Sequence, residues 1–339
     1  MSKAETGRLC VGVDLHKTQF TICALNEDGE YLLEKQYPTK EEGYSEFARE
    51  MHRFEEQGCS IELAVETTGN ARFFKNRMES EFFAVKVVNT NRFKIITMST
   101  KKTDANDAAT LAYYLMKDML PEAHLCSQTS EEIRRLLKTR SVLVQSMVKI
   151  KNQIHGMMLG YGIETKAAQL QSKRKRQELI NDLEDHNFSA YTAPSLKVML
   201  KILDDLSAEI KGIEKLLEEM VASNEDVALL MTVPGIGINT ATVIAAYTAE
   251  LERFEGNYKK FASYVGIIPS VHNSNETTHY GRITKHGPQE LRTAFVQAAL
   301  GMIRLTNVSS EWRIIKEYQR RKGDKGSGRA IIALARKIT

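Results

Sequence analysis

The chain has 339 residues, of which 42% are hydrophobic and 27% charged, a composition typical of soluble proteins with two or three domains. No apolar run is long enough to cross a membrane, no signal peptide is recognisable, and the four cysteines are widely spaced, which argues against membrane, disulfide-rich and zinc-finger classes and favours the cytoplasm. The net charge is only +4, but residues 252–339 carry 16 Lys and Arg against seven Asp and Glu, which indicates either a polyanion partner or a solubilising basic face.

Three short apolar runs open the chain in a pattern typical of consecutive antiparallel strands. They cover Leu9–Leu15, Gln19–Leu25 and Tyr31–Gln36. Helices are expected next over Tyr44–Glu56, over Ala71–Ser80 and from Asp104 onward. Strands are expected between them, over Ile61–Val65 and Phe83–Val88. This order of elements predicts an α/β domain of the ribonuclease H-like class.

Four acidic residues stand where this fold would bring them together. Asp14 lies on the first strand, Glu66 follows the fourth, and Asp104 and Asp107 share one face in the first turn of a helix. The first strand of such a sheet is central and has the fourth as its neighbour, so the four carboxylates are expected to converge and to bind Mg²⁺, which prefers oxygen ligands. Taken alone, Asp104 and Asp107 also fit an ordinary first turn, where the helix dipole favours acids.

Two long amphipathic stretches make up the middle of the chain. Apolar residues recur at spacings of three and four from Leu136 to Met157, and again from Leu196 to Met220. The pattern predicts a helical hairpin or coiled coil, either as an intramolecular antiparallel pair or as the contact between two copies of the chain. The basic cluster Lys173–Arg176 between the stretches is either a nucleic-acid contact or a solvated loop.

Pro234–Gly237 joins two apolar helical stretches with the sequence Pro-Gly-Ile-Gly. The turn resembles a helix-hairpin-helix element, in which Gly235 and Gly237 would let the backbone approach a nucleic-acid phosphate. A tight structural turn would also require glycine. Both interpretations stay open from the sequence.

A polar loop is expected from Ser270 to Tyr280. It is rich in hydroxyl and amide side chains and is followed by Arg282, Lys285 and Arg292. Hydroxyl groups next to cations suit chemistry on a phosphodiester, because positive charge stabilises the developing charge on phosphorus. Composition alone does not select a nucleophile.

Six motifs occur in order along nearly the whole chain: Gly12–Lys17, Glu66–Asn70, Lys102–Ala108, Pro234–Gly237, Tyr264–Pro269 and Gly281–Lys285. Together they resemble the DEDD transposases of the insertion-sequence 110 family, the bridge-RNA-guided recombinases. The resemblance implies a RuvC-like DEDD domain over residues 1–125, a coiled-coil segment over 126–224 and a mainly helical transposase domain over 225–339. It makes Asp14, Glu66, Asp104 and Asp107 the Mg²⁺ ligands.

The resemblance also implies a serine nucleophile between Pro269 and Gly281. Ser274 is the matching residue, although Asn275 follows it where the family usually has glycine. Asn tolerates positive φ better than most residues, so the loop shape can persist. Ser270 is the alternative nucleophile, and we expect relatives to continue slightly beyond the last residue of this chain.

The predicted function is therefore a transposase that cuts and rejoins donor and target DNA through a covalent phosphoserine intermediate. Arg282, Lys285 and Arg292 are candidate phosphate contacts. The family further implies a structured noncoding bridge RNA and a homo-oligomer, either a dimer or a tetramer. The alternatives are a RuvC-like metal-dependent junction endonuclease, in which water replaces the serine, and a non-enzymatic nucleic-acid binder.

Overall fold

The computed structural model describes residues 7–90, 92–93, 103–182, 188–249, 251–274, 277–305 and 311–339. The chain divides into two compact units, Met1–Leu125 and Cys126–Thr339. Each unit has its own hydrophobic clusters and is described by itself. No helix in the described ranges is both long enough and apolar enough to cross a membrane.

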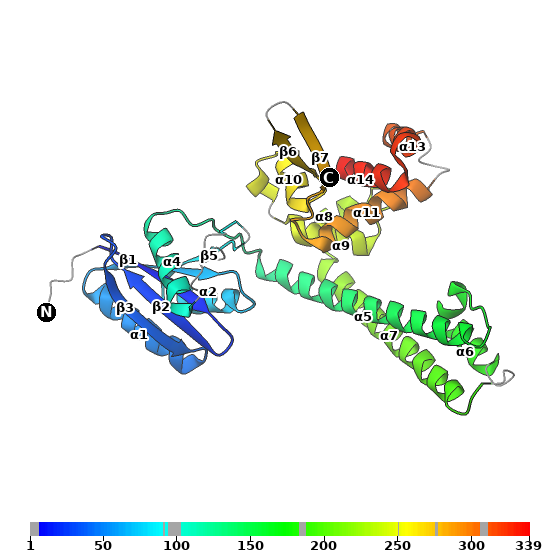
Figure 1. Ribbon diagram of the computed structural model, residues 1–339, viewed down its shortest axis with the longest axis horizontal. Coiled ribbons are helices and arrows are strands. Elements are labelled where there is room, and N and C mark those ends of the chain that lie inside the picture. The colour runs from blue at the N-terminus through cyan, green and yellow to red at the C-terminus, as the bar shows by residue number, and fades with distance from the viewer. Residues whose placement is uncertain are drawn as a thin grey trace. The chain divides into compact units, whose positions relative to one another are not determined.

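The first unit is built on a five-stranded sheet with the order β3-β2-β1-β4-β5 (Figure 1). Its strands are β1 (Arg8–Leu15), β2 (Gln19–Leu25), β3 (Tyr31–Pro38), β4 (Ser60–Glu66) and β5 (Ala84–Val88). The first three strands are antiparallel, whereas β4 runs parallel to β1 and to β5. The prediction that the first strand is central and has the fourth as its neighbour is confirmed.

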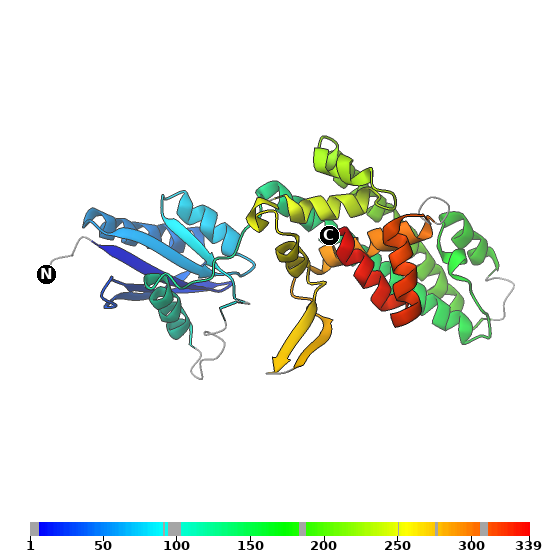
Figure 2. The same cartoon turned by 90° about the horizontal axis from the view of Figure 1, so that it is seen from above.

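Helices cover both faces of this sheet, which explains why β1 is buried along nearly its whole length. Helices α1 (Glu41–Glu56) and α2 (Ala71–Glu79) pack on one face, where Val11 and Val13 point. Helix α4 (Asp104–Met116) packs on the other face against Cys10 and Ala64. Figure 2 shows α4 on the side of the sheet opposite α1 and α2.

Gly12 allows α4 to lie directly against the central strand. A Cβ atom at this position would overlap the Ala108 carbonyl oxygen and the Ala112 amide nitrogen, and would lie 2.8 Å from the Cβ of Leu111. Only glycine therefore permits this separation of helix and strand. The close approach brings the start of α4 to the face of β1 that carries Asp14.

The second unit contains a long antiparallel helical pair, α5 (Gln128–Leu159) and α7 (Thr192–Val221) (Figure 1). Ile133 of α5 packs with Leu217 of α7 at one end, and Ile154 of α5 packs with Leu196 at the other. Arg140 forms an ion pair of 2.6 Å with Glu214 between them. The apolar spacing in both stretches thus places one helix against the other within the same chain.

The segment between α5 and α7 contains the short helix η1 (Ala167–Leu170) and α6 (Lys173–Asp182). Arg176, at the end of the basic cluster, is only 2% exposed. Its guanidinium forms an ion pair of 2.6 Å with Asp204 and donates a hydrogen bond of 3.0 Å to the Leu170 carbonyl. Arg176 therefore holds the end of the hairpin together, and both interpretations of the cluster are wrong for this residue.

The rest of the second unit consists of helices near the base of the α5–α7 pair and a two-stranded sheet. They are α8 (Glu225–Met231), α9 (Ile238–Thr248), η2 (Leu251–Phe254), α10 (Tyr258–Val265), β6 (Pro269–Ser274), β7 (Thr277–Ile283), α11 (Gln289–Arg304), α13 (Arg313–Lys325) and α14 (Ser327–Ile338). One hydrophobic cluster joins Ile133 and Leu217 of the pair to Ala298 of α11 and Leu334 of α14. The base of the long helices is thus part of the same core as the C-terminal helices.

The prediction of a polar loop from Ser270 to Tyr280 is wrong. Most of this stretch forms an antiparallel β-hairpin of β6 and β7, with Val271 paired with Tyr280. Figure 2 shows the hairpin projecting from the helices of its unit. Val271 and Tyr280 are 50% and 72% exposed, so neither points into a core and the stretch lacks the apolar alternation that identifies a strand.

Candidate metal centre and serine hairpin

The four predicted acids lie on three elements of the first unit. Asp14 is the seventh residue of β1 and only 9% exposed, and Glu66 ends β4. Val13 pairs with Val65 in parallel register, so Asp14 and Glu66 occupy the next position along the two adjacent strands. Alternation along a strand places both on the face that α4 covers.

Helix α4 supplies the other two acids in its first turn. Thr103 caps the helix, because its side-chain oxygen accepts a hydrogen bond of 3.2 Å from the Asn106 amide. Asp104 is 43% exposed and Asp107 is half-buried. The cap and the contact at Gly12 together fix where this turn meets the sheet.

A histidine that the sequence did not single out joins the cluster. The Nε2 atom of His16 lies 3.1 Å from Asp14 Oδ2 and 3.4 Å from Asp104 Oδ1. His16 follows Asp14 by two residues, so the alternation that identified the face of Asp14 was also a signal for His16. It was missed because it lies just beyond the end of β1, where the alternation rule is weakest.

The electrostatics of this cluster favour a bound cation. Burial raises the pKa of the Asp14 carboxyl, His16 opposes that rise, and the negative charges of Asp104 and Asp107 add to it. One donor atom each from Asp14, His16 and Asp104 lies within 4.8 Å of the others. These carboxylates and this imidazole are suitable ligands for a divalent metal ion.

The predicted serine region lies in the second unit. Ser274 ends β6 and pairs with Thr277 at the hairpin turn. Its side chain and residue 275 lie outside the described residues. Ser270 is half-buried, and its Oγ is so close to Gly281 that a side chain there would overlap it.

The three predicted phosphate contacts have different surroundings. Arg282 on β7 is exposed. Lys285 is exposed and has a positive φ of 56°, with its amide donating to the Gly266 carbonyl at 3.0 Å. Arg292 on α11 is half-buried and donates hydrogen bonds of 3.3 Å to backbone carbonyls of Val265 and Gly287. Arg292 therefore braces the loops beneath the hairpin.

The two predicted glycines also differ. Gly235 has a φ of 92°, and a Cβ there would lie 2.5 Å from the Met302 amide nitrogen and 2.7 Å from the Gly301 carbonyl carbon of α11. Its glycine requirement thus has a packing cause. Gly237 is exposed at the start of α9, with open space around it, so it alone offers backbone that a ligand can approach.

Comparison with protein families connects both regions. A family model for DEDD transposases of IS110, described as transposase, matches residues 11–163 and includes all four acids. A second model, described as transposase of the IS116/IS110/IS902 family, matches residues 227–315 and includes the serine hairpin. The chain belongs to the IS110 family of transposases. It is accordingly an enzyme that acts on DNA by cutting and rejoining it, and its DEDD domain implies a divalent metal ion.

Related transposases align along most of both chains. The transposase for insertion sequence element IS1111A of Coxiella burnetii is 24% identical over 96% of this chain and 86% of its own length. The transposase for insertion sequence element IS1328 of Yersinia enterocolitica is 25% identical over 85% and 82%. A probable family 20 transposase of Pseudomonas aeruginosa is 21% identical over 89% and 87%.

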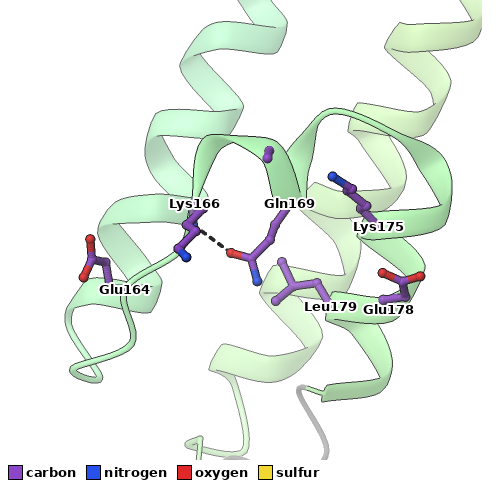
Figure 3. A pocket seen from close by; sticks show the side chains of 7 residues that line it. Glu164, Lys166, Gln169, Lys175, Glu178 and Leu179 are labelled. Atoms are coloured by element: carbon purple, nitrogen blue, oxygen red, sulfur yellow. Dashed lines mark hydrogen bonds between the residues drawn. The ribbon is translucent and has the colours of Figure 1, made fainter.

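The transposase also has a pocket near the far end of its α5–α7 pair (Figure 3). Within it, the Gln169 side-chain oxygen accepts a hydrogen bond of 2.7 Å from the Lys166 amide. Two lysines and two glutamates balance each other in the lining, which consists of Glu164, Lys166, Ala168, Gln169, Lys175, Glu178 and Leu179. None of the predicted site residues lines this pocket.

Proposed function

We propose that this transposase cuts and rejoins donor and target DNA through a covalent phosphoserine intermediate, with Mg²⁺ held by Asp14, Glu66, Asp104 and Asp107. The observation that carries the proposal is the approach of Asp14 on β1 and Asp104 on α4 to a common point at His16. Asp14 and Asp104 are far apart in sequence, so the tertiary fold brings their negative charges together. Their repulsion is relieved by a cation.

The chemistry assigned to the serine is a transesterification. The Ser274 oxygen bonds to phosphorus and loses its proton, while the bond from phosphorus to the leaving sugar oxygen breaks and that oxygen takes up a proton. Attack by a sugar hydroxyl on the phosphoserine then forms the new DNA bond and releases Ser274. When bound, the divalent ion supplies positive charge for the phosphate and favours ionisation of a coordinated hydroxyl.

The other residues of the hairpin region bind and position the substrate in this proposal. Arg282 and Lys285 are exposed at the end of β7 and contact phosphates, whereas Arg292 keeps the supporting loops in place. Gly237 offers exposed backbone at the start of α9 for a further phosphate.

The acids and Ser274 belong to different compact units, so the proposed site is composite. Joining two duplexes requires several strand ends at once, and we therefore assign the active form to a homodimer or homotetramer. Sequence choice is assigned to base pairing with a structured bridge RNA, which leaves the protein to contact mainly backbones and RNA shape.

The experiment that tests this function incubates the purified protein with its cognate noncoding RNA, labelled donor and target DNA, and Mg²⁺. We expect a slowly migrating, protease-sensitive DNA adduct on a denaturing gel, absent when EDTA removes the metal. Ser274→Ala and Asp104→Ala should both abolish the adduct, whereas Ser270→Ala should retain it.

Two outcomes would contradict the proposal. Cleavage without an adduct, unaffected by Ser274→Ala, would instead establish a RuvC-like endonuclease that uses water. Binding without any Mg²⁺-dependent cleavage would establish a non-enzymatic nucleic-acid binder. Matched thermal unfolding of each variant verifies that lost activity does not come from lost folding.

A further inference from the structure

His16 is held in place by hydrogen bonds to its backbone from separate segments of the first unit. Its amide donates to the Gln19 carbonyl at 2.9 Å. Its carbonyl accepts hydrogen bonds of 3.1 Å from the Thr39 hydroxyl, just after β3, and of 3.1 Å from the Asn70 side-chain amide, just before α2. These hydrogen bonds fix the backbone of His16 relative to the end of β3 and the start of α2.

The side chain uses this position to face two acids at once. Its Nε2 atom lies 3.1 Å from Asp14 Oδ2 and 3.4 Å from Asp104 Oδ1. Neighbouring ligands of an octahedral ion with bonds of about 2.1 Å are separated by about 3 Å. The two distances from Nε2 thus match neighbouring positions around one metal ion, and all three donor atoms lie within 4.8 Å of one another.

We infer that His16 is a metal ligand in addition to the DEDD acids, binding through Nε2, so that the ion of this transposase has a mixed nitrogen and oxygen shell. The inference rests on the proposed metal centre. It has a consequence for metal choice, because imidazole favours transition ions over Mg²⁺, which prefers an all-oxygen shell. The centre should accordingly bind Mn²⁺ more tightly than Mg²⁺.

A different role for His16 predicts different behaviour. A histidine that only bridges the carboxylates by hydrogen bonds while the site is empty would move away when an ion binds. It would then leave no nitrogen in the coordination shell, and its removal would leave metal affinity unchanged or raise it. The two roles can therefore be separated by examining the bound ion directly.

The test is electron spin echo envelope modulation of Mn²⁺ bound to the full-length protein without nucleic acid, beside Mn²⁺ and Mg²⁺ affinities from calorimetry. We expect imidazole nitrogen coupling in the unaltered protein. His16→Ala should abolish the coupling and weaken Mn²⁺ binding by about tenfold or more, with a smaller effect on Mg²⁺. The control is His52→Ala, which removes a histidine of α1 that pairs with Glu55 and Glu81 and should keep the coupling.

Asp14→Asn separates failure of this inference from failure of the proposed function. Mn²⁺ that binds in an Asp14-dependent manner without nitrogen coupling would overturn the role of His16 and leave the metal centre standing. Absence of any Asp14-dependent binding would overturn both. Because the spectrum of the unaltered protein decides the matter, the inference stays testable even where a variant fails to fold.

Discussion

At the scale of single residues, the metal centre depends on the absence of a side chain at Gly12 as well as on the carboxylates of Asp14 and Asp104. Asp14 is fixed in the central strand, but Asp104 reaches it only because α4 can lie against β1 at Gly12. Any side chain there must push the helix outward. The glycine thus couples packing of the sheet to the geometry of the acids.

Gly12→Ala should therefore loosen α4 and weaken metal binding together. We expect overpacking to lower the free energy of opening of α4 by about 1–3 kcal/mol, measured by hydrogen exchange of its amides, and to reduce Mn²⁺ affinity in the same protein. The matched control is Gly69→Ala, since no atom lies within 4 Å of a Cβ at Gly69. Equal protection of α4 in the two variants would show that the helix does not depend on Gly12.

At the scale of elements, the sequence is most informative where burial is strong and periodic. The strands of the first unit and the two long helices could be predicted because their apolar residues must face a core. The β6–β7 hairpin could not, because exposed Val271 and Tyr280 give no such pattern. The close packing of Gly235 against the backbone of Gly301 could not be predicted either, because the two residues are distant in sequence.

The turn between α13 and α14 carries exposed positive charges that sequence periodicity does not reveal. Glu317 of α13 forms one ion pair with Arg321 of the same helix and another with Lys337 of α14, and the second pair links the two helices. Around the turn, exposed cations without an ion pair among the described residues follow one another: Arg320, Lys322, Lys325 and Arg329. Their positive charge is suited to the phosphates of duplex DNA.

The double variant Lys322→Gln and Arg329→Gln should weaken DNA binding without altering sequence preference. If both side chains bind phosphates, the slope of log K against log salt should become shallower by about 0.9 for each phosphate that is no longer neutralised, as measured by fluorescence anisotropy over a salt series. Lys201→Gln with Lys211→Gln on α7 is a control of equal charge change. An identical loss of DNA affinity in both double variants would show that the effect comes from the net charge of the protein and not from these two positions.

At the scale of the whole molecule, the proposed chemistry is divided between two units. Asp14 and Asp104 stand in one unit and Ser274 in the other, and the two family matches separate them likewise, since the match over residues 11–163 holds the acids and the match over residues 227–315 holds Ser274. The division itself could be anticipated from the change from a sheet pattern to a helical one near residue 126. Whether the acids of one protomer meet its own serine or the partner's could not be anticipated, because apolar periodicity does not say whether the helix it packs against belongs to the same chain or to another copy.

Mixing two inactive variants would reveal whether a site is shared between protomers. Ser274→Ala retains the acids and Asp104→Ala retains the serine. A shared site is therefore intact when its acids come from the Ser274→Ala protomer and its serine comes from the Asp104→Ala protomer. Random assembly of a symmetric dimer from equal amounts makes this combination in about a quarter of the sites. We expect adduct formation to return to about that level, whereas each variant alone gives none. If the mixture stays as inactive as its components while both variants still form mixed oligomers, then each protomer must complete its own site and the two units must meet within one chain.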